Sequence, residues 1–387
     1  MKKVTNNVFY VGVNDHEIDL FEGHYDVPNG MAYNSYVIVE DKVVVMDSVG
    51  EDFFEEWVNN IKEVLGKREP DYIVVQHMEP DHSKNLEKFI NEYPNITVVA
   101  SMQAFKMMGQ FFPNLEIKNK LVVKENDVLP LGKGELKFIC APMVHWPEVI
   151  FTYYNEDKVL FSADAFGKFG ALDIEDPEGW ACEARRYYFG IVGKYGVQVQ
   201  NVLKKLAGTP IEVICPLHGP VLDENLEYYL NTYNTWSSYG VESEGVAIFY
   251  TSVYGHTKEA VLMLADELKR LGCPKVVVND LAREDMAECV EDAFRYGKIV
   301  LATTTFNMEI FPFMNEFITS LVERNYQKKT IGLIENGSWA PTAGKVMKDK
   351  LACLKEISIL EPMVKILSAV NEKNKEEIKL LAEELMK

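Results

Sequence analysis

The chain has 387 residues, of which 47% are hydrophobic and 26% are charged. That length is enough for two or three domains, each with its own hydrophobic core. The formal net charge of -19 at pH 7 argues against nucleic-acid binding, because an acidic surface repels the phosphate backbone.

The cysteines and the N-terminus indicate the compartment. The six cysteines form no CxxC pair, which favours free thiols in a reducing compartment over an iron–sulfur cluster or a rubredoxin-type metal knuckle. The N-terminus has no apolar stretch of signal-peptide length, and no apolar run is long enough to cross a bilayer. We therefore expect a soluble, cytoplasmic protein that makes no membrane contact.

The first two thirds of the chain contain two runs of short strands accompanied by helices. The strands are expected at Val8–Val13, Tyr36–Val39, Val43–Met46, Tyr72–Val75, Thr97–Ala100, Leu121–Val123, Leu136–Cys140, Val149–Tyr154, Lys158–Phe161 and Ile211–Cys215. The helices are expected at Asp52–Leu65, Leu86–Glu92, Gln103–Phe111 and Ala181–Leu206. This order predicts an αββα sandwich with a site at the strand ends.

The stretch Gln76–His82, QHMEPDH, directly follows an apolar strand and holds four ligand-type side chains: His77, Glu79, Asp81 and His82. Alternate side chains after a strand point to one rim, so the first three can converge, and His82 can face the same point from the next segment. Imidazole with carboxylate suits iron or zinc better than magnesium. An isolated HxE pair is more often a solvated loop, but four such residues this close together indicate a metal site.

Three further ligand-type residues each follow a predicted strand. His145 stands in APMVHWPE, Asp164 in FSADAFG and His218 in CPLHGP. A single histidine in a turn rich in proline and glycine is more often a capped structural residue. Together, however, the three repeat one rule, in which the end of a strand delivers one ligand-type residue.

The pattern changes at Trp236–Gly245, where serines, glycines and glutamates gather, and we expect domains at residues 1–243 and 244–387. Strands and helices then alternate regularly. The strands are expected at Val246–Tyr250, Lys275–Asn279, Ile299–Thr303, Ile331–Ile334 and Ile357–Leu360. The helices are expected at Lys258–Leu271, Glu284–Tyr296, Phe311–Asn325, Ala343–Cys353 and Glu376–Met386. This predicts a doubly wound parallel sheet that binds its ligand at the carboxyl ends of its strands.

The first strand-to-helix turn of this second part is TSVYGHT, Thr251–Thr257. It offers the hydroxyls of Thr251, Ser252 and Thr257, one glycine, and the free N–H groups of a helix start, which suit a phosphate dianion. It lacks the lysine of a nucleoside-triphosphate P-loop, and the chain has no GxGxxG of a dinucleotide fold. We therefore expect a monophosphate ligand.

The order HxExDH…H…D…H resembles the metallo-β-lactamase fold in the version found in flavodiiron proteins. Hydrolases of that fold usually have a second histidine where this chain has Glu79, and a carboxylate there favours iron over zinc. The resemblance implies two irons. Their ligands would be His77, Glu79 and His145 for one iron and Asp81, His82 and His218 for the other, with Asp164 as the bridge.

The same resemblance implies two outer residues that donate hydrogen bonds at the metals. The segment GHYDVPNGMAYNSY, Gly23–Tyr36, is similar to the N-terminal segment of the family and places His24 near the irons. Tyr195, in VGKYG, is expected to face the same pocket. The alternative is a surface histidine and a core tyrosine.

The last third resembles flavodoxins, and this resemblance names the monophosphate as FMN. Two later loops, ATTTFNMEIFP (Ala302–Pro312) and ENGSWAPTAG (Glu335–Gly344), would hold the isoalloxazine ring, with Trp339 stacking on it or, alternatively, packing at a loop tip. His256 replaces the small polar residue more usual near the phosphate. The positions carried over are Thr251, Ser252, Val253, Tyr254, Gly255, His256, Thr257, Thr304, Thr305, Phe306, Asn307, Glu335, Asn336, Gly337, Ser338, Trp339 and Ala340.

The flavodiiron resemblance covers essentially the whole chain. It implies an oxidoreductase that reduces dioxygen to water and/or nitric oxide to nitrous oxide at a diiron centre fed by FMN. It also implies a head-to-tail homodimer, or a dimer of dimers, in which the flavin of one subunit faces the irons of the next. No rubredoxin or flavin-reductase segment follows the flavodoxin-like part, so we expect a separate donor: rubredoxin or a reduced deazaflavin such as coenzyme F420.

Other functions fit parts of the sequence. A zinc-dependent hydrolase of the metallo-β-lactamase fold with a flavin module is one, and Glu79 counts against it. A non-enzymatic electron carrier of the flavodoxin type is another, and intact activity after His145→Ala would support it. A nuclease of the same fold is disfavoured by the net charge.

Overall fold

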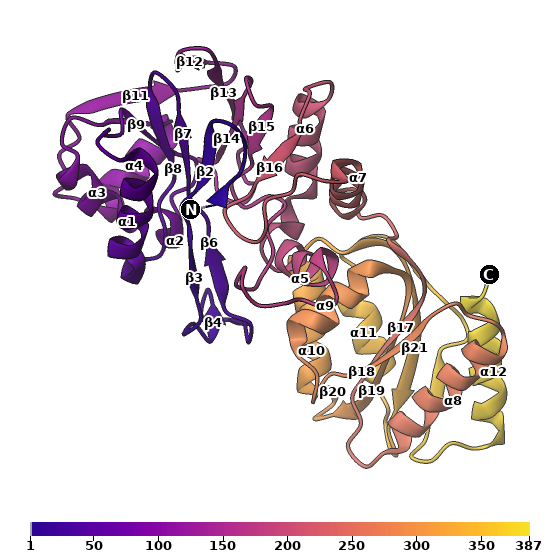
Figure 1. Ribbon diagram of the computed structural model, residues 1–387. Helices are drawn as coiled ribbons and strands as arrows, with labels where there is room; N and C mark the ends of the chain where they lie inside the picture. Colours follow the sequence, from indigo (N-terminus) through magenta and orange to yellow (C-terminus); the bar gives the residue numbers. More distant parts are fainter. Residues whose placement is uncertain (1) are drawn as a thin grey trace. The chain divides into compact units, whose positions relative to one another are not determined.

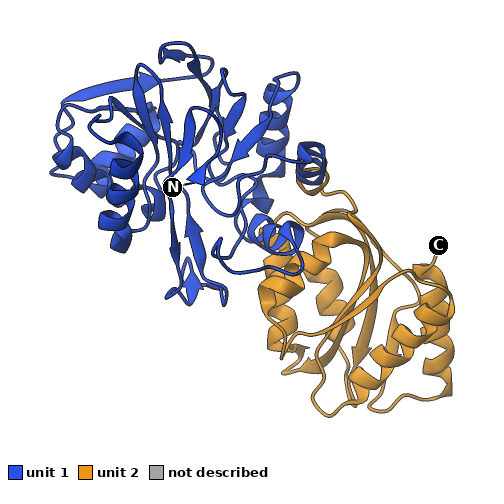
Figure 2. Ribbon diagram, viewed as in Figure 1, with its two compact units in different colours: residues 1–234 blue, residues 235–387 orange. Residues whose placement is uncertain are grey.

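The computed structural model describes residues 2–387, which form two compact units (Figure 2). Unit 1 is Met1–Asn234 and unit 2 is Thr235–Lys387. The division lies within helix α7 (Leu226–Ser237), and the boundary expected between residues 243 and 244 lies at the start of strand β17 (Ser243–Tyr250).

Unit 1 is built on two sheets (Figure 1). The first has the order β1-β2-β7-β8-β9-β10-β11 and the second has the order β12-β13-β14-β15-β16. The strands of the first sheet are β1 (Lys2–Lys3), β2 (Val8–Tyr10), β7 (Tyr36–Val39), β8 (Val43–Met46), β9 (Tyr72–Val75), β10 (Thr97–Ser101) and β11 (Asn119–Val123). The strands of the second are β12 (Val128–Pro130), β13 (Glu135–Cys140), β14 (Ile150–Tyr154), β15 (Val159–Phe161) and β16 (Val213–Cys215).

Apolar side chains of both sheets meet in one core. Val44 and Val74 of the first sheet and Phe138 and Phe161 of the second are fully buried in the same cluster. Removing such side chains from water is the main term that holds two sheets together. Helices cover the outer faces (Figure 1), so the predicted αββα sandwich is confirmed. Helices α1 (Phe54–Leu65) and α4 (Met102–Phe111) contact the first sheet, and α6 (Gly196–Leu206) contacts the second. The other helices of this part are α2 (Pro80–Ser83), α3 (Leu86–Glu92) and α5 (Trp180–Tyr187).

Two small antiparallel pairs extend the N-terminal part of unit 1: β3 (Val13–Asp15) with β6 (Met31–Tyr33), and β4 (Leu20–Phe21) with β5 (Tyr25–Asp26). The single strand predicted from Val8 to Val13 is therefore wrong, because Gly12 separates two strands. A Cβ at Gly12 would lie 2.5 Å from the carbonyl oxygen of Tyr33, so the break needs glycine.

The long helical segment predicted at Ala181–Leu206 is confirmed, but it is not one continuous α-helix. Helix α5 ends at Tyr187, and a π-helical turn (Tyr188–Val192) and a 3-10 turn (Gly193–Tyr195) follow before α6 begins. Apolar residues continue through the break, so the sequence pattern does not reveal it. Helix α7 was not predicted, because its tyrosines, asparagines and threonines are weak helix formers.

Unit 2 is a parallel sheet in the order β18-β17-β19-β21-β22 with helices on both faces, and the predicted doubly wound sheet is confirmed (Figure 1). Besides β17, its strands are β18 (Val276–Asp280), β19 (Tyr296–Phe306), β20 (Glu309–Ile310), β21 (Gln327–Asn336), β22 (Lys355–Ile359) and β23 (Val364–Ile366). Its helices are α8 (His256–Arg270), α9 (Met286–Arg295), α10 (Pro312–Glu323), α11 (Ala343–Leu351) and α12 (Glu372–Leu385). Within residues 2–387, no helix has the length and apolarity to cross a membrane.

The outer position of this sheet is filled by two short strands. Strand β22 pairs with the start of β21, and β23 pairs with its end. The sequence indicated only the first piece, because Pro362 interrupts the pattern and β23 has three residues. Strand β23 places Ser368, two residues after its end, at the carboxyl edge of the sheet.

Candidate metal centre and cofactor pocket

The seven ligand-type residues lie together at one edge of the unit 1 sandwich, in the segments that follow four strands. All are buried except Asp81, which is half-buried. They are His77, Glu79, Asp81 and His82 after β9, His145 after β13, Asp164 after β15 and His218 after β16.

The first cluster consists of His77, Glu79, His145 and Asp164, whose ligand atoms all lie within 4.8 Å of one another. The Nε2 atom of His77 lies 3.2 Å from Oε2 of Glu79 and 3.1 Å from Oδ2 of Asp164. The Nε2 atom of His145 lies 3.1 Å and 3.0 Å from the same two oxygens. Two imidazoles and two carboxylates thus point at one space.

The second cluster consists of Asp81, His82 and His218. The Nε2 atoms of the two histidines lie 3.0 Å apart, and each lies 3.3 Å from Oδ2 of Asp81. The other oxygen of Asp164, Oδ1, lies 3.3 Å from Nε2 of His82 and 3.8 Å from that of His218. Asp164 therefore turns one oxygen to each cluster.

The hydrogen bonds behind the histidines show what the clusters can hold. Nδ1 of His77 lies 2.8 Å from the carboxylate of Glu148, and Nδ1 of His218 lies 2.8 Å from the carbonyl oxygen of Ala32. Both partners accept hydrogen bonds, so Nδ1 carries the hydrogen and Nε2 of the neutral ring presents a lone pair. A lone pair that faces the oxygens of Asp164 repels them unless a cation lies between.

The charge of the clusters points the same way. Both oxygens of Asp81 and of Asp164 are buried and accept no hydrogen bond from any described residue. Burial by itself would lower the pKa of the histidines, but Asp164 and Glu79 raise the pKa of His145 to about 9 and that of His77 well above its usual value. The cage thus attracts positive charge, and its imidazole and carboxylate donors fit two transition-metal ions.

Two buried acids that sequence reasoning missed hold the metal loop. Glu148 faces the ring of His77 and also accepts the N–H of Met78 at 2.8 Å. Asp47 accepts the N–H groups of Gln76 and His77, and burial raises its pKa to about 6. Asp47 directly follows β8, so the rule that strand ends deliver functional residues could have found it.

Tyr187 was also missed. Its ring centroid lies 5.5 Å from that of His218, and its buried hydroxyl has no hydrogen-bond partner among the described residues. Burial, and then the charges of Asp164 and Glu79, hold the pKa of Tyr187 well above its ordinary value, so the phenol keeps its proton. Nothing in the sequence distinguishes it from the tyrosine that follows.

The two predicted outer residues lie in the turn between β4 and β5 and in the 3-10 turn after α5. His24 is exposed, with its ring 4.6 Å from that of Tyr25, and Tyr195 is half-buried in the 3-10 turn. Among the described residues, no hydrogen bond joins either one to the seven ligand-type residues. In the same turn as His24, Glu22 hydrogen-bonds to Glu79, and desolvation together with the charge of Glu79 raises the pKa of Glu22 to about 7.

Unit 2 contains a cavity of about 740 Å³ where the predicted cofactor loops meet, a size usual for cofactor pockets. Met308 and Ser368 line it and were not predicted, whereas Thr251, Gly255, Glu335 and Ala340 are not among the lining residues. The predicted positions that line it are Ser252, Val253, Tyr254, His256, Thr257, Thr304, Thr305, Phe306, Asn307, Asn336, Gly337, Ser338 and Trp339.

Three of the predicted positions outside the lining shape the loops. The hydroxyl oxygen of Thr251 lies 2.7 Å from that of Thr303, and Glu335 accepts the N–H of Gly344 at 2.8 Å. Gly255 has a φ of +95°, which favours glycine, and it directly precedes α8. The loop conformation therefore depends on residues that stand behind the cavity wall.

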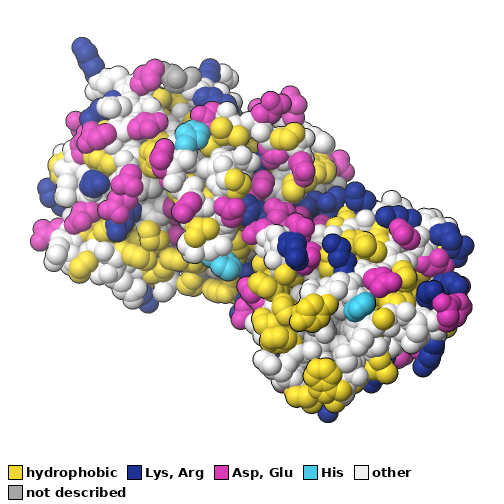
Figure 3. All heavy atoms as spheres, turned by 90° about the horizontal axis from the view of Figure 1, so that it is seen from below, with side chains coloured by type: hydrophobic (Ala, Val, Ile, Leu, Met, Phe, Trp, Pro, Cys, Tyr) yellow, Lys and Arg dark blue, Asp and Glu magenta, His cyan; other side chains and the backbone are white. Residues whose placement is uncertain are grey.

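The chemistry of the cavity wall fits FMN. No acidic side chain lines it, although the chain has a net charge of -19. Ser252, Thr257 and the first turn of α8 suit a phosphate. Tyr254 and Trp339, which are 91% and 81% exposed, offer flat faces to an aromatic ring. Figure 3 shows hydrophobic side chains gathered on this face of unit 2.

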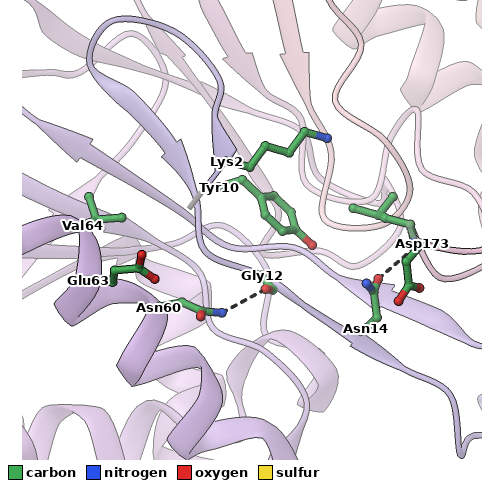
Figure 4. A pocket seen from close by; sticks show the side chains of 9 residues that line it. Lys2, Tyr10, Gly12, Asn14, Asn60, Glu63, Val64 and Asp173 are labelled. Carbon is green, nitrogen blue, oxygen red and sulfur yellow. Dashed lines mark hydrogen bonds between the residues drawn. The ribbon is translucent and has the colours of Figure 1, made fainter.

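A separate hollow of about 340 Å³ lies in unit 1, where Tyr10 forms part of the wall (Figure 4). Its polar groups bind each other: the amide of Asn60 donates to the carbonyl oxygen of Gly12 at 3.3 Å, and Asn14 accepts the N–H of Leu172 at 2.9 Å. None of the seven ligand-type residues lines it. We assign no function to this hollow.

Known proteins resemble the whole chain. Residues 31–219 match the ODP family beta lactamase model. A nitric oxide reductase of Moorella thermoacetica is 28% identical over 368 residues, which cover 93% of this chain and 91% of that protein. The flavodiiron protein of Giardia intestinalis superposes with a TM-score of 0.91 at 24% identity, covering 99% of this chain and 95% of that one. Rubredoxin oxygen:oxidoreductase of Desulfovibrio gigas superposes with a TM-score of 0.90 at 24% identity, covering 99% of this chain and 97% of that one.

These similarities agree with the geometry of both units. An ODP-type sandwich with a cage of histidines and acids is followed by a flavodoxin-like sheet with an acid-free pocket. The chain therefore matches the ODP family beta lactamase model over residues 31–219 and has, over nearly its whole length, the fold of solved flavodiiron proteins.

Proposed function

We propose that this protein reduces nitric oxide to nitrous oxide and dioxygen to water at two irons in unit 1, with electrons from FMN in unit 2. The observation that carries the proposal is the carboxylate of Asp164, which turns one oxygen to each of two clusters of like composition. The acid-free cavity of unit 2 adds a place for the electron carrier, which a hydrolase would not need.

Each cluster would hold one iron, and Asp164 would contribute an oxygen to each. The irons, when bound, supply the binding and reduction of the diatomic molecule, and FMN supplies electrons one at a time. The carboxylates offset the charge of two cations in a buried site. The residues are His77, Glu79 and His145 for one iron, Asp81, His82 and His218 for the other, and Asp164 between them.

Residues around the cage keep water out and hold a proton. The ring of Phe21 lies 5.4 Å from that of His218, and the ring of Trp146 lies 5.2 Å from that of His77. These contacts cover the imidazoles with apolar surface, which strengthens the electrostatic interactions inside. Tyr187 keeps its proton, so its hydroxyl would be available as a hydrogen-bond donor beside His218.

The proposal includes partners. The donor is a separate rubredoxin, in line with the name of the Desulfovibrio gigas enzyme, or a reduced deazaflavin such as F420. A head-to-tail homodimer, or a pair of such dimers, would bring the flavin of one subunit to the irons of the next. Cys140, Cys215, Cys273, Cys289 and Cys353 are free thiols in the described part of the chain, which supports the cytoplasm as the compartment.

The test is metal analysis followed by anaerobic assay. The purified chain should contain two irons and one FMN, and it should consume nitric oxide, dioxygen or both when a chemically reduced donor is added. His145→Ala should abolish consumption and leave FMN bound. Two zincs with hydrolytic activity would instead identify a hydrolase. A wild-type protein that passes electrons through its FMN but consumes neither gas would identify a carrier.

A further inference from the structure

The two clusters offer the two metals nearly the same ligands. Each supplies two imidazole nitrogens, and each supplies one carboxylate of its own, Glu79 in the first cluster and Asp81 in the second. Asp164 adds one oxygen to each. Ligand identity alone therefore gives no reason for the two metals to differ in reduction potential.

The groups behind the ligands are different. In the first cluster, Nδ1 of His77 lies 2.8 Å from a carboxylate oxygen of Glu148. In the second, Nδ1 of His218 lies 2.8 Å from a neutral carbonyl oxygen, that of Ala32, and Nδ1 of His82 is buried with no hydrogen-bond partner among the described residues. A full negative charge stands behind only one of these three imidazoles.

Glu148 is held firmly in this position. Its side chain is fully buried, and Oε1 accepts the N–H of Met78 at 2.8 Å as well as facing His77. The other oxygen, Oε2, is buried without a hydrogen-bond partner among the described residues. Only part of the carboxylate is therefore satisfied by its surroundings, and its charge remains directed at the imidazole.

We propose that Glu148 is a positioning residue that makes the iron held by His77 the harder of the two to reduce. This inference rests on the proposed function, because it needs the iron pair. A carboxylate that accepts the Nδ1 hydrogen makes the imidazole more basic, and a more basic ligand favours the ferric over the ferrous ion. The iron of the second cluster, whose histidines donate from Nδ1 to no carboxylate among the described residues, takes the first electron.

The experiment is a redox titration of the full-length, iron- and FMN-loaded protein, with the two iron potentials followed by EPR of the half-reduced pair. Glu148→Gln keeps an oxygen that can accept from His77 and Met78 and removes the charge. The factor by which the first site favours ferric over ferrous iron should fall about tenfold. This is the lower end of the usual effect of losing a group that hydrogen-bonds to a metal ligand. For one electron this is about 59 mV, so the gap between the two potentials should narrow by that amount.

Asp47→Asn is the matched control. It removes a buried carboxylate that binds the same loop through the N–H groups of Gln76 and His77 rather than through an imidazole. We expect it to change the gap less than Glu148→Gln does. Equal narrowing in both variants would overturn the inference, because a general loss of charge would then explain the result.

The outcomes separate the inference from the proposed function. A wild-type protein without two irons defeats the proposed function itself. If the wild-type protein holds two irons, and Glu148→Gln leaves the difference between the two iron potentials unchanged or makes it larger, only the inference is overturned. If Glu148→Gln does not retain iron, Glu148→Asp serves, since it keeps the charge and withdraws it from His77. The difference between the two iron potentials in Glu148→Asp should lie between those expected for the wild type and for Glu148→Gln. A difference equal to that of the wild type overturns the inference.

Discussion

The carboxylate of Asp164 lies with Oδ2 3.0 Å from Nε2 of His145, while its other oxygen faces the second cluster. Asp164 is fully buried, and its carboxylate accepts no hydrogen bond from a described residue. A single acid thus links two groups of ligands, each of which combines residues after β9 with one histidine from another strand end.

Asp164→Ala is therefore expected to cost both irons, whereas His218→Ala, which removes a ligand of the second cluster alone, should cost one. The reason is that only Asp164 serves both clusters. Iron per chain, measured by elemental analysis, checks this. His24→Ala, at an exposed position, is the control and should keep two irons. Loss of a single iron from Asp164→Ala would show that the acid is not shared.

Glu79→His is expected to shift the metal preference from iron towards zinc by severalfold. The substitution replaces an anionic oxygen by a neutral nitrogen at the first cluster and leaves the second unchanged. Competitive loading of the metal-free protein with ferrous iron and zinc, followed by metal analysis, measures the ratio. An unchanged ratio would mean that Glu79 does not select the metal.

Tyr187→Phe is expected to lower turnover with either gas at least tenfold while two irons remain bound. Within residues 2–387 the hydroxyl has no hydrogen-bond partner, so its removal should not destabilise the fold, but it takes away a proton donor beside His218. Steady-state assays, iron content and urea unfolding together check this. Tyr188→Phe, whose ring packs on Tyr233, is the matched control and should keep wild-type turnover.

Trp339→Ala is expected to weaken FMN binding about tenfold, which corresponds to about 1.4 kcal/mol. Trp339 lines the cavity with 81% of its surface exposed, so it contributes little to the core of the free protein. Titration of the flavin-free protein by fluorescence gives the Kd. Leu262→Ala, an exposed apolar position on α8 outside the lining, should bind FMN like the wild type.

Lys329 provides a pH-dependent test of unit 2. Its ammonium group donates to the carbonyl oxygens of Gly240 and Phe294, and burial lowers its pKa to about 8, although Glu242 opposes the shift. In unfolded chains the pKa stays near 10.4. Between pH 8 and about 10.4 the unfolded state binds the extra proton, so Lys329 adds stability as the pH rises through this window.

Relative to Lys329→Met, the wild type should therefore gain up to about 3 kcal/mol between pH 7.5 and pH 10.5. The urea concentration that releases FMN from each protein, measured across this range, tests the difference. A difference that stays constant with pH would show that Lys329 remains charged in the folded protein.

The amino-acid sequence determined much of this protein, because some signals are local. An apolar strand followed by a polar turn places His77 and Glu79 at a sheet edge, and the regular alternation after residue 243 predicts a parallel sheet with a phosphate turn at Thr251–Thr257. Strand period and turn chemistry depend on neighbouring residues, so they can be read from the chain.

Other features were decided only by tertiary structure. Glu148 stands behind His77 across 71 residues of chain, and no local pattern relates the two. Tyr187 faces the cage because α5 ends there and a π-helical turn follows, whereas apolar periodicity continues through the break. The division of the bridging oxygens of Asp164 likewise follows from the order of strands in the second sheet. The partner of a charged side chain depends on how the sheets bring distant segments of the chain together. A local sequence pattern does not show which distant segments become neighbours.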